Sequence, residues 1–311
     1  LTNSLHADQF MLAGGPPCQG FSQQRRGEDR DPRNNLVLRF ADLATSFPTQ
    51  PAAVVLENVT YLDSPRGREI LEEYTRILSS EGYVVFRHDL NSADFGVPQL
   101  RERIFIVAVK ETWADSYRGP QPLTPNRWVT VGEAFESLPE FRKPIDREPP
   151  LPFITNHETS NESDLNKRRI AFVDMGKGRL WIPPHLQLNC HRGYDGHLDV
   201  YGRLDWFSQA RTITSGFDSF TRGEYGHPFF HRSITQREGA RLQGFPDWFE
   251  FEGNRGSVRS QIGNAVPPPM AYSVARAVKE AVSASADPLE SQDASYNGKE
   301  VKSPTKSTVK A

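Results

Sequence analysis

A short apolar run followed by two glycines and two prolines sets the first constraint on this chain. Residues 10–13 read Phe-Met-Leu-Ala, and residues 14–22 read Gly-Gly-Pro-Pro-Cys-Gln-Gly-Phe-Ser. We interpret the apolar run as a buried strand that ends before the prolines, because proline fixes φ and glycine admits conformations closed to other residues. Cys18 then follows the carboxyl end of a strand, where open α/β sheets gather ligands and reacting groups. A buried structural cysteine in a turn is the alternative that a lone Pro-Cys step would favour.

Strands and helices alternate along the first third of the chain. Apolar runs and apolar residues at helical spacing predict, in chain order, a strand at 9–13, a helix at 36–47, a strand at 52–56, a helix at 67–81 and strands at 83–88 and 104–109. This alternation is typical of a doubly wound α/β sheet, and we expect its strands to be parallel.

The chain after Lys110 has a different character. Residues 111–230 are rich in Pro, Gly, Asn and aromatic residues, which indicates a loop-rich region of short strands. At Thr235 the run Thr-Gln-Arg-Glu has the form of a helix capping box, and a final helix is expected at about 270–282. From about Ser283 onward large apolar residues are almost absent, so we expect a disordered tail.

Composition narrows the class of function. The two cysteines, Cys18 and Cys190, make neither a disulfide framework nor a metal cluster, so we expect no metal. No apolar run approaches the length of a membrane span, and we expect an intracellular protein without a membrane partner. A net charge of −2 is not the signature of a non-specific nucleic-acid binder. Local placement of arginine matters more for DNA binding than net charge does.

Glu57 follows the second predicted strand, in the run Glu-Asn-Val. We expect its carboxyl group at the carboxyl end of this strand, as Cys18 follows the end of the first. In a pocket with little water a glutamate pKa rises towards neutrality, and the group can then donate a proton. A surface carboxylate that happens to end a strand is the alternative for a glutamate considered alone.

The run Gln99-Leu-Arg-Glu-Arg103 enters the last predicted strand. Strand alternation places Gln99, Arg101 and Arg103 on one side. Two fixed guanidinium groups suit planar contacts with several acceptors. A structural ion pair with Glu102 or Asp94 is the alternative for one of the two arginines.

Two C-terminal segments complete the pattern. Residues 235–250 read Thr-Gln-Arg-Glu-Gly-Ala-Arg-Leu-Gln-Gly-Phe-Pro-Asp-Trp-Phe-Glu, and residues 261–268 read Gln-Ile-Gly-Asn-Ala-Val-Pro-Pro. With the three segments described above, and in this order, they resemble motifs of the cytosine-5 DNA methyltransferase family. The resemblance covers roughly residues 9–109 and 200–282.

The resemblance implies a fold and a domain plan. The fold is α/β, a partial doubly wound, Rossmann-like S-adenosylmethionine methyltransferase sheet with a small loop-rich target-recognition region. We expect a partial catalytic domain at 1–110, the target-recognition region at 111–260, a segment at 261–283 that returns to the catalytic domain, and a disordered tail at 284–311. The arginines of residues 235–250 are expected to pack and pair in support of the second domain.

The resemblance also implies a chemical role for particular side chains. Cys18 is the nucleophile that adds to C6 of a cytosine flipped out of duplex DNA, so that C5 can attack a methyl group. Glu57 is the acid at N3 of the ring. Arg101 and Arg103 hold the cytosine carbonyl oxygen and the neighbouring phosphate.

Further contacts are implied for DNA and for the cofactor, S-adenosylmethionine. The expected DNA-contacting residues are Gln19, Ser22 and Gln99, and residues 19–33 are expected to form a lid over the flipped base. The expected cofactor-binding residues are Pro17, Leu36, Asn264 and Val266.

One departure from the family pattern concerns the cofactor site. Family members carry a Gly-rich loop and acidic cofactor ligands ahead of the cysteine motif, whereas here only Leu1 to Gln9 precede it. We therefore expect an incomplete cofactor site, missing first strands, and an exposed sheet edge. The chain is then a fragment or one half of a split enzyme, with a complementary polypeptide as a partner, and whether it is active alone stays open.

Three functions remain. The first is a DNA (cytosine-5-)-methyltransferase of prokaryotic restriction–modification type, located in the cytoplasm at the nucleoid. The second is a non-catalytic DNA-binding remnant or partner subunit. The third is a tRNA cytosine-5 methyltransferase, which ranks lower because that branch carries Cys-Phe-Thr in its recognition region, whereas here Cys190 is followed by His191 and Arg192.

Overall fold

The structure is a computed structural model that describes residues 10–17, 35–136, 138 and 154–284. Its elements in chain order are β1 (Met11–Gly14), α1 (Asn35–Thr45), β2 (Ala53–Asn58), η4 (Thr60–Asp63), α2 (Pro65–Ser80), β3 (Tyr83–Asn91), η5 (Ser92–Phe95), β4 (Glu102–Lys110), α3 (Glu111–Ala114), α4 (Val131–Phe135), α5 (Asp164–Ile170), η6 (Arg179–Trp181), η7 (Asn189–His191), η8 (Phe220–Arg222), α6 (Gln236–Leu242), α7 (Arg255–Asn264) and α8 (Pro268–Ala284).

The sheet has the strand order β1-β2-β4-β3. The predicted α/β class is confirmed, but the prediction that all strands are parallel is wrong. Only β1 and β2 are parallel, while β4 runs antiparallel to both β2 and β3. The reason lies in the connection between β3 and β4, which holds the 3-10 turn η5 and no α-helix. Parallel neighbours need a crossover of a dozen or more residues, usually a helix, and this connection is shorter.

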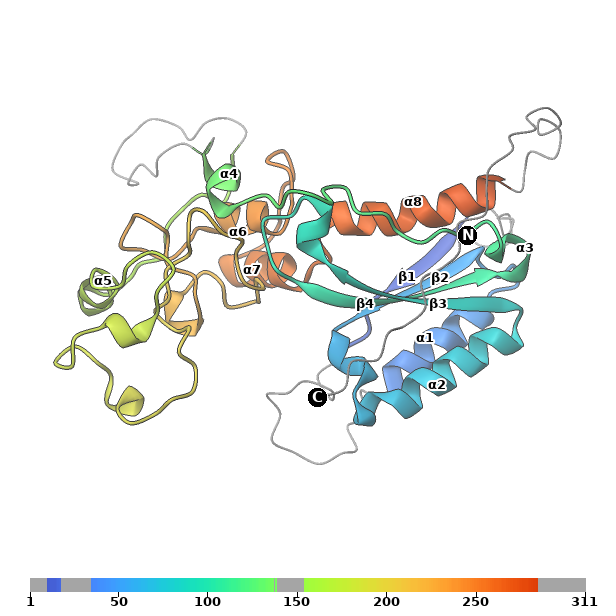
Figure 1. The fold of residues 1–311 in the computed structure, drawn as a ribbon, viewed down its shortest axis with the longest axis horizontal. Coiled ribbons are helices and arrows are strands. Elements are labelled where there is room, and N and C mark those ends of the chain that lie inside the picture. Colours follow the sequence, from blue (N-terminus) through green and yellow to red (C-terminus); the bar gives the residue numbers. More distant parts are fainter. Residues whose placement is uncertain (1–9, 18–34, 137, 139–153, 285–311) are drawn as a thin grey trace, which may run out of the picture.

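Helices cover both faces of the sheet (Figure 1). Val54, Leu56 and Ile106 point to the face covered by α1 and α2. Val55 and Val107 point to the opposite face, where α8 packs through Met270, Val274 and Ala277 among others. Because both faces are buried, β2 and β4 are continuous apolar runs rather than alternating ones.

A second lobe lies to the left of the sheet in Figure 1 and contains α4, α5, α6 and α7. It has its own core, which joins residues of α4, α6 and α7 to loop residues such as Leu204, Ile213 and Phe217. Ile170 of α5 packs in a separate cluster with Ile182 and Phe220. The prediction of short strands in residues 111–230 is wrong for the described residues of that range, which form only isolated bridges. The many prolines and glycines of this region interrupt strand pairing before a ladder can form.

Local signals in the C-terminal third are reproduced in the structure. The capping box is confirmed, since Thr235 and Glu238 exchange hydrogen bonds at the start of α6. The helix α7 was not predicted, because its sequence is polar and its start depends on a cap from Asn254.

In the part of the chain that the structure describes, none of the helices has the length and apolar character that crossing a membrane requires. The predicted tail at 284–311 lies, beyond Ala284, outside the described residues.

Candidate active site

An ion pair between Glu57 and Arg103 stands where β2 ends and β4 begins. The Nε atom of Arg103 lies 3.0 Å from Oε1 of Glu57. Antiparallel pairing sets Glu57 opposite Phe105, which brings the start of β4 alongside the end of β2. The two side chains are only 13% and 16% exposed, so little water competes for the contact. The sequence left an ion pair with Glu102 or Asp94 as the alternative for one of the two arginines, and the carboxylate that Arg103 pairs with is instead Glu57.

Opposing effects act on the Glu57 carboxyl group. Burial raises its pKa above the ordinary value of 4.5, while the positive charges of Arg103 and Arg101 lower it. Burial is the larger effect, so the net shift of the Glu57 pKa is upward. A buried carboxyl group with a raised pKa keeps its proton to higher pH than an exposed one and can donate it within the site.

The segment that follows β1 runs directly beside this carboxyl group. A side chain on Gly15 would place its Cβ 3.2 Å from Oε2 of Glu57, so the lack of a side chain allows the approach. The Nδ2 atom of buried Asn58 donates to the carbonyl of Pro16 at 3.1 Å. The end of β2 therefore holds the Gly-Gly-Pro-Pro segment in place. Asn58 lies in the run Glu-Asn-Val, but the sequence pattern predicted no role for it.

Cys18, Gln19 and Ser22 lie outside the described residues, as do the remaining residues of the expected lid at 19–33. Their expected roles stay predictions. Of that motif, the structure describes the residues up to Pro17, the one before Cys18.

The side chain of Gln99 is fully buried between the two lobes. Its Oε1 accepts from the backbone N–H of Ile213 at 2.8 Å. Its Nε2 donates to the carbonyl of Leu242 at 2.9 Å and to Oε1 of Gln243 at 2.5 Å. The expectation that Gln99 contacts DNA does not agree with this placement, because its amide is engaged by protein on both sides.

Gln243 and Arg101 extend the same group of hydrogen bonds, which we call the lobe junction (Gln99, Arg101 and Gln243 with their backbone partners). Gln243 donates to the carbonyls of Ile262 and Ala265 at 2.8 and 3.1 Å. Arg101 is 4% exposed and donates to the carbonyls of Ile213 and Gly263 at 3.0 and 3.4 Å. These bonds hold the Arg101 guanidinium in the lobe junction. Its expected role as a ligand of the substrate stays a prediction.

Strand alternation was correctly predicted for this run. Gln99 and Arg101 are buried and Arg103 is mostly buried, whereas Leu100 and Glu102 are exposed. The sequence did not reveal that the partners of Gln99 and Arg101 are backbone groups of the other lobe, nor that Gln243 joins them. The glutamine within Arg-Leu-Gln-Gly-Phe-Pro was the only available signal, and it carries no partner information by itself.

Three of the four expected cofactor residues, Pro17, Leu36 and Val266, can be placed relative to β1. Leu36 is 39% exposed, one turn before Phe40, whose ring contacts Gly14. Val266 packs in the core cluster that contains Met11. Asn264 and Pro17 are exposed. These four supply apolar contact surface and one amide, which fits one wall of a site for S-adenosylmethionine, but they supply no acidic partner for its ribose.

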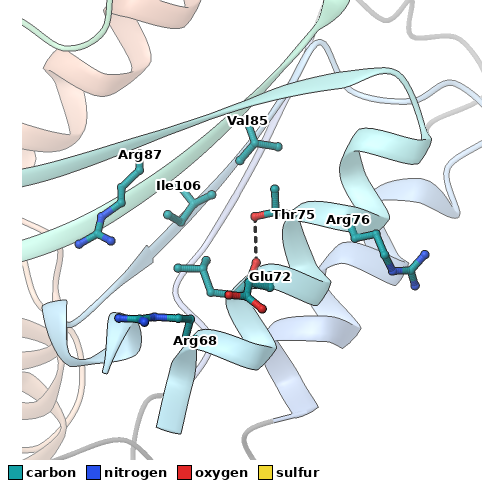
Figure 2. A pocket seen from close by; sticks show the side chains of 8 residues that line it. Arg68, Glu72, Thr75, Arg76, Val85, Arg87 and Ile106 are labelled. Atoms are coloured by element: carbon teal, nitrogen blue, oxygen red, sulfur yellow. Dashed lines mark hydrogen bonds between the residues drawn. The ribbon is translucent and has the colours of Figure 1, made fainter. Parts of the chain in front are cut away.

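A separate cavity of about 520 Å³ lies between α2 and the strands β3 and β4 (Figure 2). Its floor is Val85 and Ile106, and charged side chains such as Arg68 and Glu72 stand at its rim. None of the predicted site residues lines it. Among the described residues there is also no cluster of three His, Cys, Asp or Glu side chains that could hold a metal ion.

Comparison with known proteins agrees with the motifs and the geometry. The family model described as C-5 cytosine-specific DNA methylase matches residues 2–280. The chain belongs to this family.

Individual relatives support the same conclusion. The chain is 34% identical to the type II methyltransferase M1.HphI of Haemophilus parahaemolyticus over 88% of its own length and 69% of the relative. It is 34% identical to the type II methyltransferase M1.BsuMI of Bacillus subtilis over 86% of its length, and it spans only 60% of that protein. A solved E. coli structure described as a prophage-encoded DNA modification methyltransferase has a TM-score of 0.64 at 25% identity, with 91% of this chain and 80% of the other covered.

The first prediction concerns the electrostatics of Glu57. Replacing Arg103→Met removes a positive charge that lowers the Glu57 pKa, so this pKa rises further. Because the folded-state pKa lies above the unfolded value, the contribution of Glu57 to stability is full below about pH 4.5 and is lost as pH rises through the raised pKa. NMR titration of the Glu57 carboxyl carbon measures the shift. Arg76→Met, which removes the exposed partner of Glu73, is the matched control and leaves the Glu57 pKa unchanged.

The second prediction concerns the lobe junction. Gln99→Ala and Gln243→Ala each leave buried backbone groups without partners and lower the free energy of unfolding by about 1–3 kcal/mol. Because the two side chains bond to each other, the double variant loses less than the sum. Urea unfolding measures all three. Exposed Gln261→Ala is the control, expected within about 0.5 kcal/mol of wild type; strict additivity of the two junction variants would contradict the prediction.

Proposed function

We propose that this chain is the catalytic and DNA-recognising part of a DNA (cytosine-5-)-methyltransferase, which transfers a methyl group from S-adenosylmethionine to C5 of a flipped cytosine in duplex DNA. The observation that carries the proposal is the Glu57–Arg103 pair beside the Gly15–Pro16 backbone, two residues before Cys18. An acid with a raised pKa thus adjoins the segment that bears the expected nucleophile.

Cys18, Glu57 and Arg103 each have a separate role in the reaction. The thiolate of Cys18 forms a bond to C6 of the cytosine, and the negative charge that develops at N3 is neutralised by the Glu57 proton. Arg103 positions the Glu57 carboxyl group through the 3.0 Å contact. S-adenosylmethionine, when bound, supplies the methyl group that C5 attacks. Loss of the C5 proton to water returns its electron pair to the ring and expels the Cys18 thiolate from C6, and N3 gives its proton back to Glu57, which restores the aromatic ring and the side chains.

The open edge of β1 supports a further part of the proposal, that a cofactor-binding unit packs there. Among the described residues β1 has a strand neighbour on one side only. On α1, the helix that follows, Leu36 and Leu43 are 39% and 49% exposed. An exposed strand edge with exposed leucines nearby favours association with further protein. We propose that the unit that covers this edge carries the Gly-rich loop and the acidic ribose ligand, and that a complementary polypeptide can supply it.

The biological setting follows from the same proposal. The relatives are named type II methyltransferases, so we propose that the enzyme protects prokaryotic DNA within a restriction–modification system. Such an enzyme acts in the cytoplasm at the nucleoid.

The third prediction tests the nucleophile. A fluorine at C5 blocks release of the adduct, so enzyme reconstituted with the cofactor-binding unit and S-adenosylmethionine forms a stable covalent complex with DNA that contains 5-fluorocytosine. Cys18→Ser abolishes this complex in a denaturing gel while DNA binding persists. Cys190→Ser, which changes the exposed second cysteine, is the matched control and forms the complex normally. A complex that survives in Cys18→Ser would overturn the assignment.

The fourth prediction concerns the cofactor. Without the backbone contacts of a Gly-rich loop and an acidic ribose partner, several polar contacts of about 1–3 kcal/mol each are missing. This loss weakens binding by orders of magnitude. Calorimetry of the chain alone is therefore expected to show no measurable binding of S-adenosylmethionine, and assays to show no methyl transfer. A polypeptide that supplies the first strands restores both, whereas micromolar binding by the chain alone would refute this part of the proposal.

A further inference from the structure

The region between Ser163 and Tyr201 is a part of the second lobe, and we call it the basic lobe. It has a surface that the reaction chemistry does not use. Six of its ten charged residues are Lys or Arg, and it holds three of the eight histidines, although the whole chain has a net charge of −2. Trp181 and Tyr194 are each 49% exposed on it. Exposed basic side chains and aromatic rings together suit contact with nucleic acid. Figure 1 shows the basic lobe, with α5, at the end of the molecule opposite the sheet.

One loop of the basic lobe, Asn189–Leu198, is organised around a single buried side chain. Arg179 is 4% exposed, and its guanidinium donates to the backbone carbonyls of four loop residues. The acceptors are His197 at 3.0 Å, His191 at 3.2 Å, Gly196 at 2.8 Å and Tyr194. Because the guanidinium donors are fixed in one plane, four such bonds define the path of the loop.

The backbone of this loop is unusual at His197, whose φ of 48° lies in the left-handed region. A residue other than glycine rarely adopts this conformation, and it persists where the surrounding structure holds it. Here the carbonyl of His197 is itself an acceptor for Arg179 Nε. The loop is therefore held in one built conformation, from which Arg192, Tyr194, Asp195 and His197 are exposed.

We propose that the loop Asn189–Leu198 reads base edges in a groove of the duplex, and that Arg179 is the positioning residue that holds it in the reading conformation. The proposal rests on the proposed function, because it takes duplex DNA as the substrate. It goes beyond that function by assigning sequence recognition to particular side chains.

The exposed side chains of the loop have the chemistry that base reading requires. An arginine such as Arg192 can donate to O6 and N7 of guanine, and an aspartate such as Asp195 can accept from N4 of cytosine. Lys167, Arg168 and Lys177 are exposed elsewhere on the basic lobe and suit phosphate contacts, which position a protein on DNA without reading its sequence. Arg168 is therefore a matched control for Arg192, with the same side chain in the same lobe but outside the loop.

The experiment selects preferred sequences from a pool of randomised duplexes with the full chain, and then measures binding to the preferred duplex and to single-base variants. Arg192→Ala is expected to relax the preference at one base-pair position by about 5- to 140-fold. Arg168→Ala is expected to weaken binding to all duplexes alike and to leave the preference unchanged. Arg179→Met is expected to reduce discrimination at several positions while binding to non-preferred DNA at low salt stays within about twofold.

A second readout reports on the loop itself. Cys190 is exposed within it, so in a Cys18→Ser background a maleimide reagent labels Cys190 alone, and the preferred duplex is expected to slow that labelling. Hydrogen exchange shows whether Arg179→Met loosens only this loop. If this variant loses protection throughout the basic lobe, Arg192→Ala and the labelling rate of Cys190 decide the test instead. If Arg192→Ala keeps the wild-type sequence preference, and Cys190 is labelled as fast with the preferred duplex as without it, the assignment of the loop is overturned but the proposed function is not. Absence of duplex binding by the wild-type chain would overturn the proposed function as well.

Discussion

The two lobes of this protein are joined through the buried amide of Gln99. Its oxygen binds the backbone N–H of Ile213 in one lobe, and its nitrogen binds Gln243, whose own amide holds the carbonyls of Ile262 and Ala265. The same run of chain continues through Arg101 into β4, which carries Arg103 to Glu57. The position of Glu57 therefore depends on the lobe junction. Gln99 and Arg101 belong to the junction, and Arg103 of the same short segment pairs with Glu57.

Electrostatics at Glu57 depend on this arrangement. Burial by itself raises the pKa of the carboxyl group, and Arg103 and Arg101 moderate that rise. Moderation matters because a proton donor works best when its pKa lies near the pH at which it operates. Arg101 contributes its charge while its guanidinium donates to backbone carbonyls of the other lobe. One side chain thus links the structure of the lobe junction to the chemistry of the site.

Buried arginines donate hydrogen bonds to backbone carbonyls of the second lobe that have no partner in a strand ladder. Its described residues form loops and short helices rather than strand ladders, so many backbone carbonyls have no ladder partner. Arg179 and Arg203 each donate to four such carbonyls, and fully buried Arg237 donates to three. A guanidinium has five donors, which makes it suited to this task. The expectation that the arginines of residues 235–250 pack and pair is confirmed by Arg237 and by the contact of Arg241 with Asp247.

The sequence by itself determined the family, the α/β class, the four strands of the sheet, the helices α1, α2, α6 and α8, and the inward side of the run from Gln99 to Arg103. These follow from local signals, namely apolar periodicity, a capping box and motifs in a fixed order. Only the tertiary structure decided that β4 runs antiparallel to β2, that Glu57 pairs with Arg103, and that Gln99 and Arg101 bind backbone groups of the other lobe. Each of these depends on partners more than forty residues away in sequence, and no local pattern specifies which distant carbonyl or carboxylate a buried side chain meets.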